Sequence, residues 1–349
     1  MKFVDCKKRI FVAASGAGAG IQNRIWAEPG ISNVLVGAVF PYSIDEMDRF
    51  LGFKPDSYCS AATAVAMAIQ SYYHAFEYGK EPAVGFGLTA SVASTEVHRG
   101  EHRCHIATMT DDGCNLYKVY LKKDSGEEAR IHDGSQCDRA GIEVLKRALD
   151  PAECHNTGNN LALQNILKYP SFAKDGTRTH VSLDVVYPGA FNPPHDAHRW
   201  IARKTKATFW IDLETPHKGN LTVPQAIQRA KMLKGSDVYF STGTPLFVDK
   251  MKKANYGATI VIGSDTAYRL LDPQWGIDSK TIYETMDSYG SWFTVVTRVT
   301  DDLRSYDPYK LPDDFLRRVK DIILPPKELN NLSSSVIRSN LQSQATVSW

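Results

Sequence analysis

Two histidines, His195 and His198, follow a short apolar run and a turn rich in glycine and proline. The run 183–187 has the length and the β-branched content of a strand, and we expect a helix to begin near His198. Side chains three residues apart at a helix start point to the same side, where the helix N-terminus also favours an anion. Gly189 would let a phosphate approach the backbone closely. The spacing therefore predicts a phosphate-binding turn at the end of a strand.

A second candidate anion site lies near the end of the sequence, in the run 332–338. Hydroxyl groups and backbone amides crowd a predicted helix start there, and an arginine follows one turn later. We expect Ser335 to cap that helix, while Ser333, Ser334 and Arg338 bind phosphate oxygens. Two anion sites in one domain predict a polyphosphate ligand.

The elements that must position these residues are strands alternating with helices. Strand-sized apolar runs are separated by segments with helical periodicity, and a capping box marks the helix that starts after Thr222. Such alternation predicts a parallel sheet with helices on both faces, which binds ligands at the carboxyl ends of its strands. The predicted strands of this half are 183–187, 208–213, 237–241, 259–262 and 293–297.

The N-terminal half shows the same alternation. A strand is predicted at 9–12, a capped helix after Ser43, and a long Ala-rich helix over 61–76. Clusters of turn residues between about 150 and 182 predict the connection between two domains. The fold class is therefore α/β with two domains, 1–165 and 180–349, the second with a Rossmann-like parallel sheet.

The composition of the chain limits the classes of binding partner that we expect. The chain has 349 residues and a net charge of +2, from 41 basic and 39 acidic residues, with no long basic block, so nucleic acid is not expected. No secretory signal or membrane-length apolar run is present, which predicts a cytoplasmic protein without membrane association. Six cysteines without a CxxC pair predict neither a disulfide framework nor a metal site.

The C-terminal motifs resemble those of the nucleotidylyltransferase superfamily. Residues 189–198 follow its GxFxPxHxGH pattern except for Ala197, which stands in place of the second glycine. Residues 332–338 follow its ISSTxIR pattern except for Leu332 and Ser335, which replace isoleucine and threonine. Between them, Gly263-Ser264-Asp265 is similar to the GxD segment of nicotinamide-mononucleotide-adenylyltransferase-like members, in which the aspartate lies near the nucleotide sugar. The resemblance covers nearly all of residues 183–340.

This resemblance implies adenylyl transfer from ATP, with Mg²⁺, to nicotinamide or nicotinate mononucleotide, releasing pyrophosphate. It places His195 and His198 at the α- and β-phosphates and Arg338 at the leaving pyrophosphate. The other expected nucleotide-binding residues are Gly189, Ala190, Phe191, Gly263, Asp265, Ser333, Ser334 and Ser335. Further contacts expected with the acceptor or its phosphate are Lys218, Trp275 and Arg298.

A glycine-rich loop follows the first predicted strand, but Ile21 stands where a dinucleotide fingerprint needs glycine. The segment instead resembles the AESCTGG segment of the CinA C-terminal family, known for nicotinamide mononucleotide deamidase activity. That resemblance covers residues 8–147 and places Ser15 at the nucleophile position, with Tyr42 and Arg139 as further matches. Met47 replaces the family's lysine, which serves as the base. We therefore expect a vestigial site in a domain that binds nucleotide or holds a homo-oligomer together.

Two alternatives stay open at this point. The motifs recognise the triphosphate rather than the acceptor, so a cytidylyl- or adenylyltransferase for another phosphorylated acceptor fits them equally. A non-catalytic nucleotide-binding sensor or scaffold is the other alternative, favoured by Ala197 and Met47.

Overall fold

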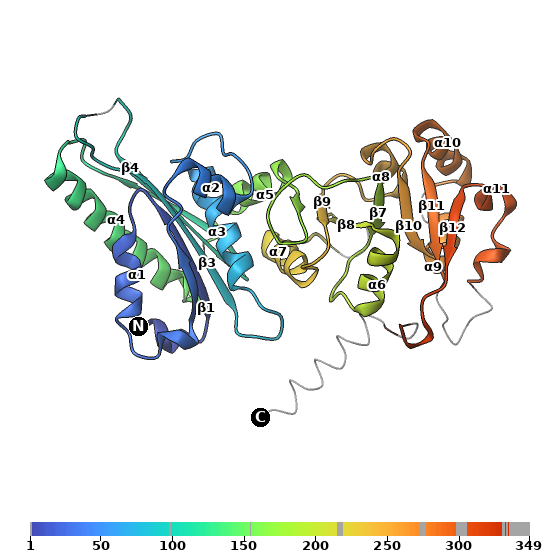
Figure 1. Cartoon of the computed structure of the whole chain (residues 1–349), viewed down its shortest axis with the longest axis horizontal. Helices are drawn as coiled ribbons and strands as arrows, with labels where there is room; N and C mark the ends of the chain where they lie inside the picture. Colours follow the sequence, from blue (N-terminus) through green and yellow to red (C-terminus); the bar gives the residue numbers. More distant parts are fainter. Residues whose placement is uncertain are drawn as a thin grey trace. The chain divides into compact units, whose positions relative to one another are not determined.

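The computed structural model describes residues 2–97, 99–153, 155–214, 219–272, 277–297, 306–329, 332 and 334. They form two compact units. The first comprises the described parts of Met1–Tyr169 together with Thr177–Thr179 and Thr222–Lys231. The second comprises the described parts of Pro170–Gly176, His180–Leu221 and Met232–Trp349. Both units combine helices with a sheet (Figure 1), which confirms a two-domain α/β protein.

The sheet of the first unit has five strands in the order β2-β1-β3-β4-β5. Strand β1 runs parallel to β2 and β3, whereas β4 is antiparallel to both β3 and β5. The sheet is therefore mixed, which the alternation of strands and helices did not indicate. The strands are β1 (Arg9–Ser15), β2 (Leu35–Val39), β3 (Ala83–Ser91), β4 (Arg103–Thr110) and β5 (Gly113–Tyr120).

Helices cover both faces of this sheet. Alternate residues of β1 point to opposite faces, so Val12 packs with Ile21 of α1 and Cys137 of α4, while Ala13 packs with Met47 of α2 and Met67 of α3. These helices are α1 (Ala19–Trp26), α2 (Ile44–Leu51), α3 (Ala61–Ala75), α4 (Glu127–Ala148) and α5 (Asn159–Lys168).

Helix α3 lies unusually close to β3, as two glycines of the strand require. A Cβ at Gly85 would lie 2.2 Å from the backbone nitrogen of Tyr72, and one at Gly87 would lie 2.4 Å from the carbonyl oxygen of Ala64. The Ala-rich sequence of α3 provides the matching small surface, and its start is capped by Ser60, whose side chain accepts from the Thr63 N–H. The predicted helix over 61–76 is thus confirmed, and packing explains its composition.

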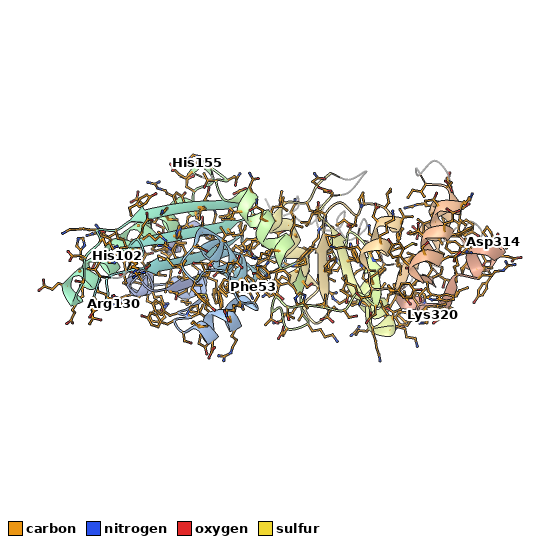
Figure 2. All side chains as sticks on the ribbon, turned by 90° about the horizontal axis from the view of Figure 1, so that it is seen from above. Phe53, His102, Arg130, His155, Asp314 and Lys320 are labelled. Atoms are coloured by element: carbon orange, nitrogen blue, oxygen red, sulfur yellow. The ribbon has the colours of Figure 1, made fainter. Side chains whose placement is uncertain are left out.

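The segment Thr177–Thr179, which belongs to the first unit, packs against Gly52. Gly52 is the C-cap residue of α2 and has a left-handed backbone conformation. A Cβ at this position would lie 2.5 Å from both the nitrogen and the oxygen of Arg178. The Arg178 guanidinium is buried and donates to the side chain and carbonyl of Asn165 and to the carbonyl of Tyr169. It also lies 5.0 Å above the ring of Phe53, which is labelled in Figure 2. Burial lowers the pKa of Arg178 to about 9.

The sheet of the second unit has seven strands in the order β12-β11-β10-β7-β8-β9-β6. All of its neighbours pair in parallel except β6, which is antiparallel to β9. The strands are β6 (Ser171–Phe172), β7 (Val185–Pro188), β8 (Thr208–Asp212), β9 (Val238–Ser241), β10 (Thr259–Gly263), β11 (Trp292–Val296) and β12 (Val319–Ile323). All five strands predicted in this half are therefore confirmed.

Apolar residues on the two faces of this sheet pack against different helices. Val261 of β10 packs with Ile201 of α6, while its neighbour Ile260 packs with Met251 of α8 and Met286 of α10. The helices in this part of the sequence are α6 (Asp196–Thr205), α7 (Val223–Met232), α8 (Phe247–Lys253), α9 (Ser264–Leu270), α10 (Ser279–Tyr289) and α11 (Asp313–Leu316). None of the helices in the described ranges is long and apolar enough to cross a membrane.

Candidate functional site

A cavity of about 310 Å³ lies in the second unit, at the carboxyl ends of β7 and β10. From β7 the chain proceeds to β8 on one side, whereas β10 lies on its other side, so the strand order reverses here. Open α/β sheets bind ligands at such a switch point. The predicted site residues that line the cavity are Gly189, Ala190, Phe191, His195, His198, Gly263, Asp265 and Ser334.

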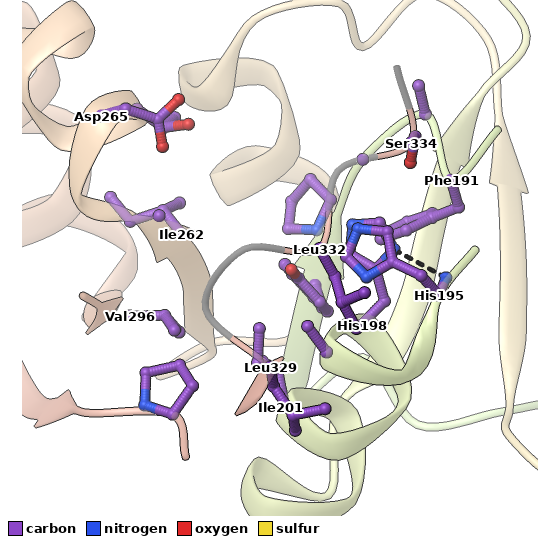
Figure 3. A pocket seen from close by; sticks show the side chains of 18 of the residues that line it. Phe191, His195, His198, Ile201, Ile262, Asp265, Val296, Leu329, Leu332 and Ser334 are labelled. Carbon is purple, nitrogen blue, oxygen red and sulfur yellow. Dashed lines mark hydrogen bonds between the residues drawn. The ribbon is translucent and has the colours of Figure 1, made fainter. Parts of the chain in front are cut away.

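The two histidines occupy the first turn of α6 (Figure 3). His195 is the N-cap residue and is buried, and its ring stacks on that of His198 with 3.6 Å between the ring centroids. The backbone N–H of His195 donates to Nδ1 of His198 over 3.3 Å. Because Nδ1 accepts this bond, a neutral His198 carries its proton on Nε2. The pair therefore presents an N–H donor at a helix N-terminus, as binding of a phosphate oxygen requires.

The turn before the histidines is built around Phe191, which has a positive φ of 45°. A Cβ at Gly189 would lie 2.6 Å from the Phe191 ring, so this ring already fills the space next to the glycine. The same ring packs against Phe209 and His198, with centroid distances of 4.7 Å and 5.0 Å. Gly189 therefore already packs against a ring of its own turn, and its expected contact with a phosphate stays a prediction.

The C-terminal serine run meets this turn although the two are far apart in sequence. The hydroxyl of Ser334 donates to the carbonyl oxygen of Pro193 over 2.8 Å. Leu332 and Ser334 both line the cavity (Figure 3). Three other predicted residues of this run, Ser333, Ser335 and Arg338, lie outside the described residues.

The opposite wall of the cavity is formed by the start of α9. Asp265 faces the cavity, as Figure 3 shows, and its carboxylate lies 3.5 Å from the guanidinium of Arg269 one turn later. Among the described lining residues, Asp265 is the one carboxylate. Three further predicted contacts, Lys218, Trp275 and Arg298, fall outside the part of the chain that the structure describes.

Two lining residues extend the predicted set. Ala197, which stands in place of the family's glycine, lies in the first turn of α6 and lines the cavity with 7% of its surface exposed. Phe247 begins α8 and also lines the cavity. No pattern in the sequence marked this phenylalanine.

The candidate nucleophile of the first unit is hydrogen-bonded to a backbone carbonyl and not to a base. Ser15 ends β1 with 9% of its surface exposed, and its hydroxyl donates to the carbonyl oxygen of Pro41 over 3.0 Å. Met47, at the position of the resembling family's base, is buried in an apolar cluster with Ala13 and Met67. A carbonyl oxygen and a thioether cannot take the proton that a serine must lose to attack an amide.

An arginine that the sequence analysis did not select lies beside Tyr42. Arg130 of α4, labelled in Figure 2, donates to the Tyr42 hydroxyl over 3.0 Å and to the carbonyl of Ala93 over 2.8 Å. Arg139 lies nine residues later on the same helix, which is about half a turn from the face of Arg130. The structure therefore brings Arg130, and not Arg139, to Tyr42.

The glycine-rich loop after β1 is occupied by a side chain of its own unit. A Cβ at Gly20 would lie 2.2 Å from a carboxylate oxygen of Asp138 on α4. Burial raises the pKa of the Asp138 carboxyl, and the N–H groups of Gly20 and Gly18 oppose this shift by hydrogen bonding to it. The start of α1 is thus hydrogen-bonded to a carboxyl group of its own unit.

We therefore expect no deamidase activity from the first unit. The full chain incubated with nicotinamide mononucleotide should release ammonia at the background rate, because Ser15 donates to a carbonyl and Met47 stands at the position of the base. Ser15→Ala should give the same rate as the unsubstituted chain. Ammonia release that disappears in Ser15→Ala would contradict this expectation.

Comparison with known proteins gives a partial likeness. No family model matches the chain, and no curated protein matches it significantly. Solved structures similar to it include the competence/damage inducible protein CihA from Agrobacterium tumefaciens, at 20% identity and a TM-score of 0.33, covering 42% of this chain and 89% of that one. The competence-damaged protein (CinA) superfamily protein from Enterobacter cloacae is 16% identical, with a TM-score of 0.34, and covers 43% and 86%.

Proposed function

We propose that the second unit is a nucleotidyltransferase that moves the adenylyl group of ATP onto nicotinamide or nicotinate mononucleotide. One observation supports this most directly. The histidine turn after β7, the start of α9 after β10 and Ser334 line one cavity at the switch point of the sheet. Its volume of about 310 Å³ is at the lower end of small-molecule sites, which span roughly 300–1,000 Å³.

The chemistry needs positioning and charge stabilisation rather than a covalent intermediate. An oxygen of the acceptor phosphate attacks the α-phosphorus of ATP, and the bond from that phosphorus to the bridging oxygen breaks, releasing pyrophosphate. His195 and His198 would donate to phosphate oxygens at the start of α6, where the helix dipole favours the negative charge. Asp265, across the cavity, would accept from hydroxyl groups of the nucleotide sugar.

Mg²⁺ is the metal that this chemistry implies. The lining residues are compatible with a Mg²⁺ ion that is bound mainly by the phosphates of the substrate. A single carboxylate, Asp265, faces the cavity and lies 3.5 Å from Arg269, so the described residues build no carboxylate cage. Mg²⁺ commonly binds through substrate phosphates and water, which demands no such cage. Bound to the triphosphate, it would neutralise charge on the departing pyrophosphate.

The test is pyrophosphate release from ATP or CTP, with each mononucleotide and with other phosphorylated acceptors in turn. We expect release only when ATP and one mononucleotide are both present. Release with a different acceptor or with CTP would select the runner-up, another nucleotidyltransferase. Tight ATP binding without release for any acceptor would select a sensor or scaffold, the function that Ala197 favours.

Removing one methyl group should improve nucleotide binding. Ala197 lines the cavity where the resembling family has glycine, so its Cβ narrows the space above the first turn of α6. Ala197→Gly should strengthen ATP binding by about fivefold, which corresponds to about 1 kcal/mol of relieved crowding. Equilibrium titration with ATP measures the effect.

The matched control is Ala202→Gly, a buried alanine of the same helix that does not line the cavity. It should lower stability by up to about 1 kcal/mol through helix propensity alone and leave ATP affinity unchanged. If both variants bind ATP as the unsubstituted chain does, Ala197 does not crowd the ligand.

A further inference from the structure

Phe247 is an aromatic side chain of the cavity to which the proposed chemistry gives no role. It is the first residue of α8, it is partly exposed, and it lines the cavity. Two other residues with benzene rings line the cavity, Tyr187 and Phe191. Their rings pack against one another and against Phe209. No other described aromatic ring packs against Phe247; its partly buried side chain packs against the apolar core of the unit and borders the cavity.

A buried lysine holds the start of α8 in place. Lys250 is 3% exposed, and its ammonium lies 2.6 Å from a carboxylate oxygen of Asp212. It also donates to the carbonyl oxygens of Thr244 and Pro245 over 2.5 Å and 3.3 Å. The same ammonium lies 5.6 Å from the centroid of the Phe247 ring, within the range of a cation–π contact.

The other oxygen of Asp212 completes this arrangement. It accepts from the hydroxyls of Ser241 and Thr244, over 2.5 Å and 2.6 Å, and from the indole N–H of Trp210 over 3.2 Å. Asp212 ends β8 and Ser241 ends β9, so the loop that leads into α8 is fixed to two adjacent strand ends. Every polar group that meets the ion pair is hydrogen-bonded, which makes a rigid support rather than a reactive centre.

We propose that Phe247 is a specificity-determining residue that stacks on the planar base of a nucleotide in this cavity, and that Lys250 and Asp212 are the residues that position it. The proposal rests on the function proposed above and adds the chemical class that Phe247 recognises, a heteroaromatic ring. Such a ring is present both in ATP and in the acceptor mononucleotide. The Lys250 ammonium and the apolar core hold the phenylalanine ring where it borders the cavity.

The decisive measurement compares ligands with and without a base. Phe247→Leu should weaken binding of ATP or of nicotinamide mononucleotide by about tenfold, as expected for loss of one base-stacking contact. The affected ligand identifies the base that Phe247 meets. Inorganic tripolyphosphate, which has no base, should bind Phe247→Leu and the unsubstituted chain equally. Phe247→Trp, which keeps an aromatic face, should bind within about threefold of the original.

A double-mutant cycle tests the positioning role. The paired change Lys250→Met with Asp212→Asn removes both charges while keeping an acceptor for Trp210, Ser241 and Thr244. If the pair acts through Phe247, it should weaken base binding by several-fold, and adding Phe247→Leu should weaken it no further than Phe247→Leu alone. Denaturant midpoints of each variant confirm that the binding measurements are made on folded protein.

Three outcomes would overturn this inference. Unchanged nucleotide binding in Phe247→Leu would show that the ring meets no base. Equal weakening of tripolyphosphate and nucleotides would show a general distortion of the cavity, and additive effects in the cycle would remove the positioning role. Binding of neither ATP nor mononucleotide by the unsubstituted chain would refute the proposed function itself, a result distinct from the other three.

Discussion

Replacing His195 with alanine should reduce pyrophosphate release by about 10²–10³-fold, the cost of removing one preorganised donor to a transition-state anion. The side chain is buried, lines the cavity and stacks on His198 at a distance of 3.6 Å between centroids. Its loss would also remove the ring on which that of His198 stacks. Initial rates at saturating ATP and acceptor measure the effect on kcat.

The N-cap position of His195 complicates the alanine variant, because alanine caps helices poorly. His195→Asn restores a good N-cap while removing the imidazole, so it should lose nearly as much activity with a normal unfolding midpoint. His180→Ala, at an exposed histidine of the same unit, should keep full activity. Full activity in both His195 variants would exclude this residue from phosphate binding.

Lys250→Met should lower the free energy of unfolding by about 3 kcal/mol. The change leaves the Asp212 carboxylate largely buried without its cation, at the end of a central strand. In the native chain, burial lowers the pKa of Lys250, and the negative charge of Asp212 opposes this shift. The charge of Lys250 in the folded protein therefore depends on its contact with Asp212. Urea unfolding followed by tryptophan fluorescence measures the loss.

Lys253→Met is the matched control, since Lys253 is an exposed residue of the same helix and should change stability by less than about 0.5 kcal/mol. Adding Asp212→Asn to Lys250→Met should restore part of the stability, because it removes the unpaired charge. A Lys250→Met protein as stable as the Lys253→Met protein would mean that the ion pair contributes nothing to the fold.

Local patterns predicted the elements of the second unit well, for identifiable reasons. The strands of the parallel sheet are buried on both faces, so they appear as short continuous apolar runs. The capping box at Thr222 and Gln225, which begins a helix assigned to the first unit, was visible as well, and both of its hydrogen bonds are present. Two strands escaped notice: β6 has only two residues, and β12 (Val319–Ile323) carries a lysine and an aspartate.

The candidate site was less accessible from the sequence. Motif spacing identified the histidine turn and the serine run, and the structure brings Ser334 to Pro193 across 141 residues. Pairing within the first sheet, the contact of Arg130 with Tyr42 and the burial of Lys250 all depend on tertiary packing. An isolated lysine in a helical stretch reads as a surface charge, so nothing local distinguished Lys250 from Lys253.

The close passage of the connecting segment over Gly52 limits how this chain can vary. Any larger residue at position 52 would displace the backbone of Arg178, because its Cβ would lie 2.5 Å from the nitrogen and the oxygen of Arg178. That displacement would withdraw the guanidinium from Asn165 and Tyr169 and break the three hydrogen bonds that it donates to them. Among related sequences, glycine at 52 and arginine at 178 should therefore be retained together or replaced together, as an inherited pair.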